Sequence, residues 1–123
     1  MTNNARSYKD LIVWQKAIAL AKIVYELTGK LPSEEKFGLV AQMRRAAISI
    51  PSNIAEGQAR HTTGEFIQFV SHAEGSAAEL DTQLILTFEL GFCAEVETQL
   101  SSELVVEIRK MLNALRRKLS THA

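Results

Sequence analysis

The amino-acid sequence predicts an all-α protein, an up-down-up-down antiparallel four-helix bundle with a proline kink in helix two. Apolar residues recur at steps of three and four over four successive segments, which is the spacing of one face of a helix. Gly29, Gly57 and Gly91 punctuate this pattern, and no segment alternates apolar and polar residues as a strand does. Short connections between amphipathic helices favour antiparallel neighbours, so a bundle is the expected architecture.

The 123 residues fit a single domain, 1–123, in which we expect residues 1–7 to be disordered. Hydrophobic residues make up 46% and charged residues 23%, and the formal net charge is zero, so the chain is neither a disordered segment nor globally basic. Cys93 is the only cysteine, which excludes an internal disulfide and suits a reducing compartment. Because no apolar run is long enough for a signal peptide or a membrane span, we expect a cytoplasmic protein without a membrane partner.

The first helix is expected over about residues 10–28 and is ended by Gly29 and Pro32. Its core-facing positions are predicted to be Trp14, Ala17, Ile18, Ala21, Tyr25 and Thr28. Ile12, Ile23 and Leu27 form an extra apolar flank that a single core does not need.

The second helix is expected over residues 34–58, with Ser33 as its N-cap. Its apolar side is formed by Leu39, Met43, Ala46, Ala47, Ile50 and Ile54. Pro51 removes one hydrogen bond and its ring clashes with the carbonyl of Ala47, at a cost of about 3 kcal/mol. Because Ile50 and Ile54 stay on the apolar side, we predict that the helix continues past Pro51 with a kink. The alternatives are a second helix broken at Pro51 and a three-helix core with one helix exchanged between subunits.

A polar strip runs along helix two, formed by Gln42, Arg45, Ser49, Asn53 and Glu56. One interpretation is the solvent face that every bundle helix needs. The other is a polar network at a subunit contact or shallow pocket, in which Arg45 and Glu56 must find partners on other helices. Asn53 is also placed to satisfy backbone groups that Pro51 frees.

The third helix is expected to begin at a cap provided by Thr62 or Thr63 and to end at Gly91. Its apolar face is formed by Phe66, Phe69, Val70, Ala73, Ala77, Leu80, Leu84 and Phe88. Gly75 costs up to about 1 kcal/mol relative to alanine, so we expect a neighbouring backbone to approach closely there. A second apolar flank is formed by Ile67, Ala78 and Ile85.

The fourth helix follows, with a seam formed by Leu100, Leu104, Ile108, Met111, Leu115 and Lys118 or Leu119. Acids occupy its first half and bases its second half, which complements the helix dipole. The basic end is a candidate nucleic-acid contact, and its members are Arg109, Lys110, Arg116, Arg117 and Lys118. The competing interpretation is a solvated helix end.

No motif for catalysis or metal binding is present. None of His61, His72 and His122 has a glutamate three residues earlier, as a di-iron bundle requires. Zinc-binding spacings, a glycine-rich phosphate loop and a nucleophile elbow are missing as well. Ser71 and His72 are adjacent on a helix and therefore point about 100° apart, so they do not form a nucleophile–base pair. We expect no enzyme activity, no cofactor and no metal.

The segment Ala46-Ala-Ile-Ser-Ile-Pro-Ser-Asn-Ile-Ala-Glu-Gly57 resembles the four-helix-bundle family encoded in intervening sequences of bacterial 23S ribosomal RNA genes. Ala73-Glu-Gly-Ser-Ala-Ala-Glu-Leu80 and Trp14-Gln-Lys-Ala17 extend the resemblance, which covers about Tyr8 to Leu115. The resemblance implies an all-α bundle, a homopentameric barrel and no known enzymatic activity. It also implies distant kinship with the bundle that assists diversity-generating retroelements by engaging reverse transcriptase and nucleic acid, whose basic character this neutral chain lacks.

The sequence thus predicts a non-enzymatic, oligomeric bundle protein of this family, an assembly or interaction scaffold whose partner is a second copy of itself. The alternative is a nucleic-acid-binding module that uses the basic end of helix four. Its partner would be RNA or a nucleic-acid-processing protein. The apolar flanks of helices one and three support oligomerisation independently of the resemblance, because soluble monomers rarely leave large apolar patches open.

Overall fold

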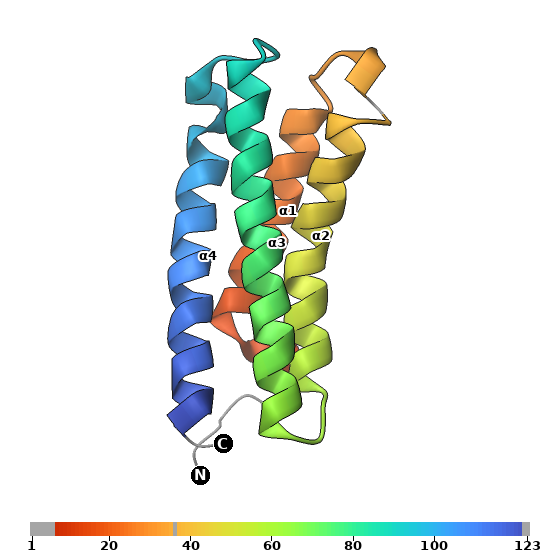
Figure 1. Ribbon diagram of the computed structural model, residues 1–123. Coiled ribbons are helices and arrows are strands. Elements are labelled where there is room, and N and C mark those ends of the chain that lie inside the picture. Colours follow the sequence, from red (N-terminus) through yellow and green to blue (C-terminus); the bar gives the residue numbers. More distant parts are fainter. Residues whose placement is uncertain (1–6, 36, 122–123) are drawn as a thin grey trace.

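The computed structural model describes residues 7–35 and 37–121, and this part of the chain is helical and contains no strand. Its four long helices pack in a closed ring, in which α1 and α3 each contact both α2 and α4 (Figure 1). Figure 1 also shows that neighbouring helices run in opposite directions. The predicted all-α four-helix bundle is confirmed. The long helices are α1 (Ile12–Thr28), α2 (Leu39–Gln58), α3 (Thr63–Glu89) and α4 (Glu95–Thr121), and the short 3-10 helices are η1 (Tyr8–Asp10) and η2 (Ser33–Glu35).

The core face of α1 differs from the predicted one. Its buried apolar residues are Val13, Ala17, Leu20, Val24 and Leu27. Ile18 and Tyr25, which were predicted to face the core, are exposed, and Trp14 is half-buried. Leu27 was assigned to the extra flank and is a core residue instead. Because α1 is apolar around most of its circumference, residue spacing alone does not choose between two adjacent faces.

The predicted start of the second helix at residue 34 is wrong, because α2 begins at Leu39. Two tight turns precede it: the Glu35 N–H donates to the Pro32 carbonyl (2.9 Å), and the Gly38 N–H donates to the Glu35 carbonyl (3.2 Å). Gly38 is the N-cap residue, and its backbone (φ −102°, ψ −106°) is not helical. The Ser33 segment therefore forms its own 3-10 turn, η2, rather than the first turn of α2.

Pro51 lies buried inside α2, which continues to Gln58. The predicted continuation past Pro51 is confirmed, and the alternative of a broken second helix is wrong. The kink itself stays a prediction. The Asn53 side chain donates to the carbonyl of Ser49 (2.8 Å). It therefore does not reach the Ala47 carbonyl, which loses its helical donor to the proline ring.

Gly57, rather than Gly75, is the glycine that permits close packing. A Cβ atom on Gly57 would lie 2.7 Å from Cβ of Phe69 and 3.0 Å from Cδ1 of Phe66, so α2 and α3 approach each other through the missing side chain. A Cβ atom on Gly75 would meet nothing within 4 Å, so the close approach predicted there is wrong. The predicted end of the second helix at residue 58 is correct, because α2 ends at Gln58.

Both predicted ends of the third helix are present in α3. The Thr62 hydroxyl accepts a hydrogen bond from the Glu65 N–H (3.2 Å), which makes Thr62 the N-cap. At the other end Gly91 takes a positive φ of 82°, and the Phe92 N–H donates to the Thr87 carbonyl (3.0 Å), as in a Schellman motif. The buried apolar residues of α3 all belong to the predicted face: Val70, Ala73, Ala77, Leu80 and Leu84.

The core face of α4 also departs from the prediction. Its buried residues are Thr98, Ser101, Val105, Ile108 and Leu112. Ile108 was predicted to lie there, whereas Leu100 is exposed. Two hydroxyl groups can be buried because each finds an acceptor in its own helix: Thr98 donates to the Glu95 carbonyl (2.8 Å) and Ser101 to the Thr98 carbonyl (3.0 Å).

The first and last helices are adjacent, and α1 begins at the end of the bundle where α4 ends (Figure 1). The connections from α1 to α2 and from α3 to α4 lie at the opposite end. Within the described ranges, none of the helices combines the length and apolar character that crossing a membrane requires.

Candidate functional site

Two shallow hollows follow one another along the groove between α3 and α4. The acidic hollow, nearer the α3–α4 connection, has a volume of about 560 Å³. The basic hollow, nearer the end of α4, has a volume of about 530 Å³. The acidic hollow is lined by Asp81, Ile85, Phe88, Glu95, Val96, Thr98, Gln99, Ser102 and Glu103. The basic hollow is lined by Glu74, Val106, Arg109, Lys110, Asn113, Ala114 and Arg117.

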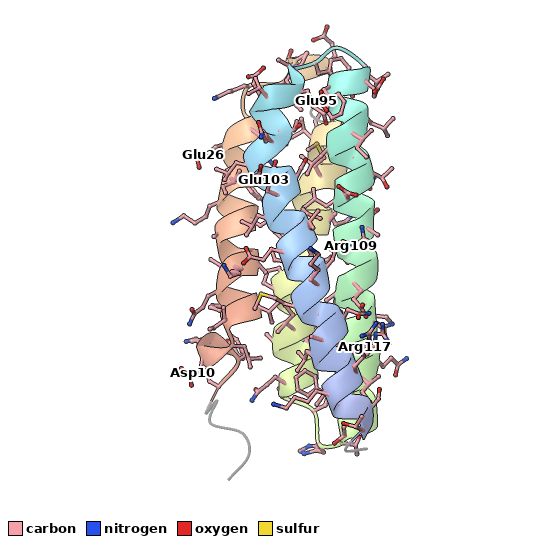
Figure 2. All side chains as sticks on the ribbon, turned by 90° about the vertical axis from the view of Figure 1, so that its left-hand side faces the viewer. Asp10, Glu26, Glu95, Glu103, Arg109 and Arg117 are labelled. Atoms are coloured by element: carbon pink, nitrogen blue, oxygen red, sulfur yellow. The ribbon has the colours of Figure 1, made fainter. Side chains whose placement is uncertain are left out.

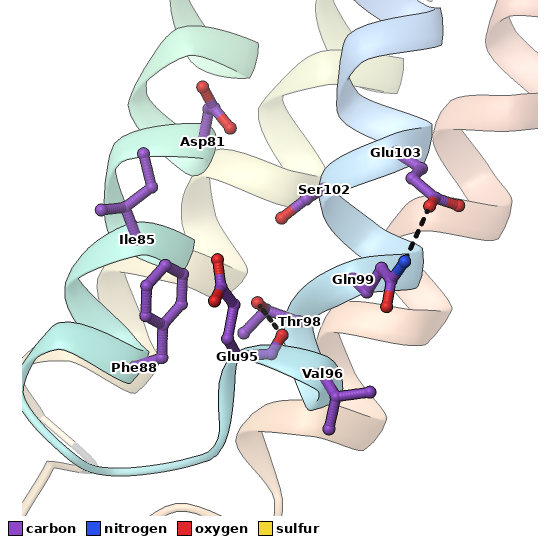
Figure 3. A pocket seen from close by; sticks show the side chains of 9 residues that line it. All are labelled: Asp81, Ile85, Phe88, Glu95, Val96, Thr98, Gln99, Ser102 and Glu103. Carbon is purple, nitrogen blue, oxygen red and sulfur yellow. Dashed lines mark hydrogen bonds between the residues drawn. The ribbon is translucent and has the colours of Figure 1, made fainter.

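Every charged residue that lines the acidic hollow is a carboxylate. Figure 3 shows that Asp81, together with two apolar side chains, reaches this hollow from α3, while Glu95 and the remaining residues come from α4. The Gln99 amide donates to one carboxylate oxygen of Glu103 (3.3 Å). The arrangement combines negative charge with an apolar wall, which suits a cationic or hydrogen-bond-donating partner.

Three of the four charged residues that line the basic hollow are cations. Its only acid, Glu74, is already paired: Arg116 Nε donates to Glu74 Oε1 (2.6 Å). This hydrogen bond and the negative charge of Glu74 raise the pKa of Arg116 above its ordinary value, so its guanidinium stays protonated throughout the neutral range. The basic hollow therefore keeps a net positive charge from Lys110 and Arg117, whereas Arg109 lies 3.7 Å from the Asp81 carboxylate.

The basic end predicted on helix four is partly neutralised by α3. Arg109 lies 3.7 Å from the Asp81 carboxylate, and Arg116 pairs with Glu74 as described above. The other three members, Lys110, Arg117 and Lys118, are exposed and form no ion pair with any residue of the described ranges. The prediction considered only acids on the same helix, whereas the acids that pair with Arg109 and Arg116 lie on α3.

The polar strip of helix two faces outward between α2 and α3. Gln42, Arg45 and Glu56 are exposed, whereas Ser49 and Asn53 are half-buried. Arg45 donates to the Gln42 side chain and lies 3.6 Å from Glu79 of α3, so it has the partner on another helix that was expected. Glu56 pairs instead with Arg60, four residues along its own chain (3.8 Å). The strip therefore splits into separate contacts and lines neither hollow.

Other reactive groups do not add to the site. Cys93 is half-buried in the α3–α4 connection, where burial and the charge of Glu97 raise the pKa of its thiol. Among residues 7–35 and 37–121, no three His, Cys, Asp or Glu side chains gather closely enough to hold a metal ion.

The charge division of the groove could be read only in part from the sequence. The order of acids and bases along α4 is visible in the sequence, and Figure 2 shows it in space: Glu95 and Glu103 lie toward one end of the helix, Arg109 and Arg117 toward the other. The contribution of Asp81 from α3 to the acidic hollow was missed, because helix periodicity does not reveal which faces of two helices meet.

The fold and the two hollows define a four-helix-bundle protein whose surface groove is divided by charge. A sequence profile described as 23S rRNA-intervening sequence protein matches residues 9–114, and the chain belongs to this family. It is also similar in fold to a crystal structure from Bacteroides thetaiotaomicron, described as a protein with unknown function from the S23 ribosomal protein family. The TM-score is 0.80 at 24% identity, covering 85% of this chain and 98% of that one. A search of curated proteins finds no match.

Proposed function

We propose that this chain is a non-enzymatic homo-oligomer, an assembly or interaction scaffold that works in the cytoplasm. The observation that carries the proposal is the set of large apolar side chains that a single copy leaves on the surface of α1, α3 and α4. The exposed fractions are 60% for Ile12, 46% for Ile85, 71% for Val96, 62% for Leu100 and 46% for Val106. Covering such side chains stabilises an assembly by roughly 25 cal/mol per Å² of apolar area.

The apolar flanks predicted on helices one and three are smaller than expected, and α4 supplies the rest of the exposed apolar surface. On α1, Ile12 is exposed and Ile23 is half-buried, but Leu27 belongs to the core. Of the flank predicted on α3, Ile85 is exposed, whereas Ile67 and Ala78 are half-buried. The surface that supports self-assembly therefore centres on α4 and its two neighbours.

Light scattering coupled to gel filtration tests the assembly. At micromolar concentration the particle mass is expected to be a multiple of the 13.7 kDa chain mass. The family resemblance implies five copies, so a pentamer would agree with it, and a dimer would contradict only the number five. A monodisperse monomer across the accessible concentrations would contradict the scaffold proposal.

The non-enzymatic part of the proposal rests on the sequence, which contains no motif for catalysis or metal binding. Cys93, the only cysteine, supports a reducing compartment. An activity that is lost when residues of either hollow are replaced would contradict this part, and cell fractionation tests the cytoplasmic location.

A second candidate function is RNA binding through the basic hollow. It is favoured by Lys110, Arg117 and Lys118, which are exposed and have no ion pair in the described part of the chain. Filter binding at low salt should then retain RNA, and the affinity should fall steeply as salt is added because phosphate contacts release counterions.

A matched pair of variants locates the RNA contact. Lys110→Ala/Arg117→Ala should weaken retention, whereas Lys22→Ala/Lys30→Ala removes the same charge from exposed positions on α1 and in the loop that follows it, and should not. Equal losses in both variants would place the contact elsewhere, and no retention by the wild-type protein would exclude this candidate.

A further inference from the structure

We propose that one strip of α4 docks antiparallel against the same strip of a second copy of this chain, about a twofold axis that passes beside Val106. The proposal rests on the proposed self-assembly and adds the surface and the orientation. We call this surface the α4 outer strip; its members share one side of α4 and line the two hollows, and they are Glu95, Gln99, Glu103, Val106, Arg109, Asn113 and Arg117.

The charges of the α4 outer strip are inverted about Val106. Glu103 lies three residues before Val106, and Arg109 lies three residues after it. Glu95 and Arg117 lie eleven residues before and after the same centre. In an antiparallel pair of α4 helices with the axis at Val106, each of these acids therefore lies at the same level as a base of the other copy. A parallel pairing would oppose acid to acid and base to base, which costs free energy, so charge selects the antiparallel orientation.

The uncharged members follow the same symmetry. Gln99 and Asn113 lie seven residues on either side of Val106, so amide lies opposite amide, and Val106 itself meets Val106 of the second copy. Ile85 of α3 lines the acidic hollow beside the strip and is 46% exposed, so it adds apolar surface near this centre. An apolar centre with a polar surround is the usual anatomy of an interface.

The strip is free to make these contacts within a single copy. Glu95, Gln99, Glu103, Arg109 and Arg117 are all exposed. One residue of the strip, Arg109, forms an ion pair with another helix, and its distance to Asp81 of α3 is long at 3.7 Å. The Arg109 side chain stays 48% exposed, so its guanidinium can donate hydrogen bonds to a second carboxylate.

From Glu95 to Arg117 the strip is about 33 Å long and a helix is about 10 Å wide, which gives on the order of 330 Å² per copy. Stable interfaces bury roughly 800 Å² per partner, so the strip by itself makes a weak contact. A twofold contact joins copies in pairs, and where other flanks close a ring it would join two rings.

Cysteine cross-linking tests the axis. In a Cys93→Ala background, Val106→Cys should form a covalent dimer with an oxidant or a short bismaleimide, because only a residue at a twofold axis meets itself. Val96→Cys is the matched control: it is ten residues from the axis, so its two copies would lie about 30 Å apart, far beyond the 4.4–6.8 Å between Cα atoms that a disulfide spans. Failure of Val106→Cys to cross-link, or equal cross-linking at both positions, would overturn the proposal.

Charge reversal tests the pairing. Glu95→Lys/Glu103→Lys makes both halves of the strip basic. Lys110→Glu/Arg117→Glu reverses Arg117 of the strip and Lys110, which lines the basic hollow beside it, so this half gains a net negative charge while the Arg109–Asp81 pair stays intact. Each variant alone should associate at least about tenfold more weakly than the wild type. An equimolar mixture should restore association as a complex that contains one chain of each variant.

Two control variants carry the same change of net charge at exposed positions outside the strip: Glu26→Lys/Glu89→Lys and Lys22→Glu/Lys30→Glu. Both should keep the wild-type mass, and circular dichroism should show that all four variants fold. If the strip variants also keep the wild-type mass, the docking proposal fails while the scaffold proposal stands. If the wild type is a monomer, the scaffold proposal fails as well. If Lys110→Glu/Arg117→Glu loses RNA retention but keeps its mass, the basic half serves RNA and the docking proposal is wrong.

Discussion

Gly57 and Gly75 both lie inside helices, but Gly57 is tightly packed and Gly75 is open to its surroundings. Replacing each glycine with alanine tests this difference. We expect Gly57→Ala to lower the free energy of unfolding by about 1–3 kcal/mol, because its Cβ would press on Phe69 and Phe66. We expect Gly75→Ala to raise it by about 0.5–1 kcal/mol, because the site is open and alanine is the better helix former. Urea unfolding monitored by circular dichroism measures both. A gain in stability for both variants would show that the two phenylalanines yield without cost.

The Cys93 thiol should react slowly with alkylating reagents near pH 8. Burial, and secondarily the charge of Glu97, raise the pKa of the thiol, so a smaller fraction is thiolate at a given pH than in the unfolded chain. The pH at which the iodoacetamide rate rises should therefore be higher in the folded protein than in urea. Since the folded state binds the proton more tightly, stability should also fall as the pH rises past the ordinary thiol pKa of about 8.5. Faster alkylation of the folded protein would contradict this.

At the scale of the helix, Arg44 fastens the end of α1 to α2. Its Nε donates to the Thr28 hydroxyl (2.8 Å), and its guanidinium lies 4.4 Å from the centre of the Tyr25 ring. Lysine cannot reproduce both contacts, so Arg44→Lys should lower the free energy of unfolding by about 1–2 kcal/mol. The neighbouring Arg45→Lys is the control, and because Arg45 is exposed its effect should stay within about 0.5 kcal/mol. Equal effects would mean that the guanidinium geometry is not what stabilises this junction.

How far the sequence predicts these helices depends on how much of each helix is apolar. On α2 and α3 the predicted apolar faces include most of the buried apolar residues, such as Ile50 and Leu84, because polar residues mark the opposite side; Val40 of α2 was missed. On α1 and α4 two adjacent stripes are available, and the choice between Leu100 and Ser101 is made by packing against α1 and α3. A buried serine or threonine hydroxyl can donate to a carbonyl of its own helix, so its burial costs little free energy. Its polarity therefore does not mark the solvent-facing side of the helix.

At the scale of the whole molecule, the bundle and its family were predictable because they depend on periodicity and on a distinctive run of residues around Pro51. The candidate site was predictable only along one helix. The bases of α4 are contiguous in the sequence, but the acids that pair with two of them, Asp81 and Glu74, come from α3. Which residues of two helices face each other depends on their relative rotation, which residue spacing does not supply.

Self-assembly should make the thermal stability depend on protein concentration. An oligomer is favoured over unfolded monomers by mass action, so the Tm of the wild-type protein should rise as the concentration is increased. The Lys110→Glu/Arg117→Glu variant should show a weaker dependence if the α4 outer strip contributes to the assembly. Calorimetry at several concentrations from micromolar upward measures the effect. A wild-type Tm that is independent of concentration would contradict assembly in that range.

Because α1 and α4 are adjacent, the bundle does not require α1 to be the first helix of the chain. Because α1 begins where α4 ends, a short peptide could join Thr121 to Tyr8, and the chain could then be cut between α1 and α2 near Ser33. The resulting circular permutant would read α2, α3, α4, α1, and each helix would still follow an antiparallel neighbour. Such rearrangements are tolerated when the new ends fall in exposed connections. The same core should therefore form in this permutant, in which α4 and α1, the neighbouring helices most distant in the natural chain, are joined directly as a helical hairpin.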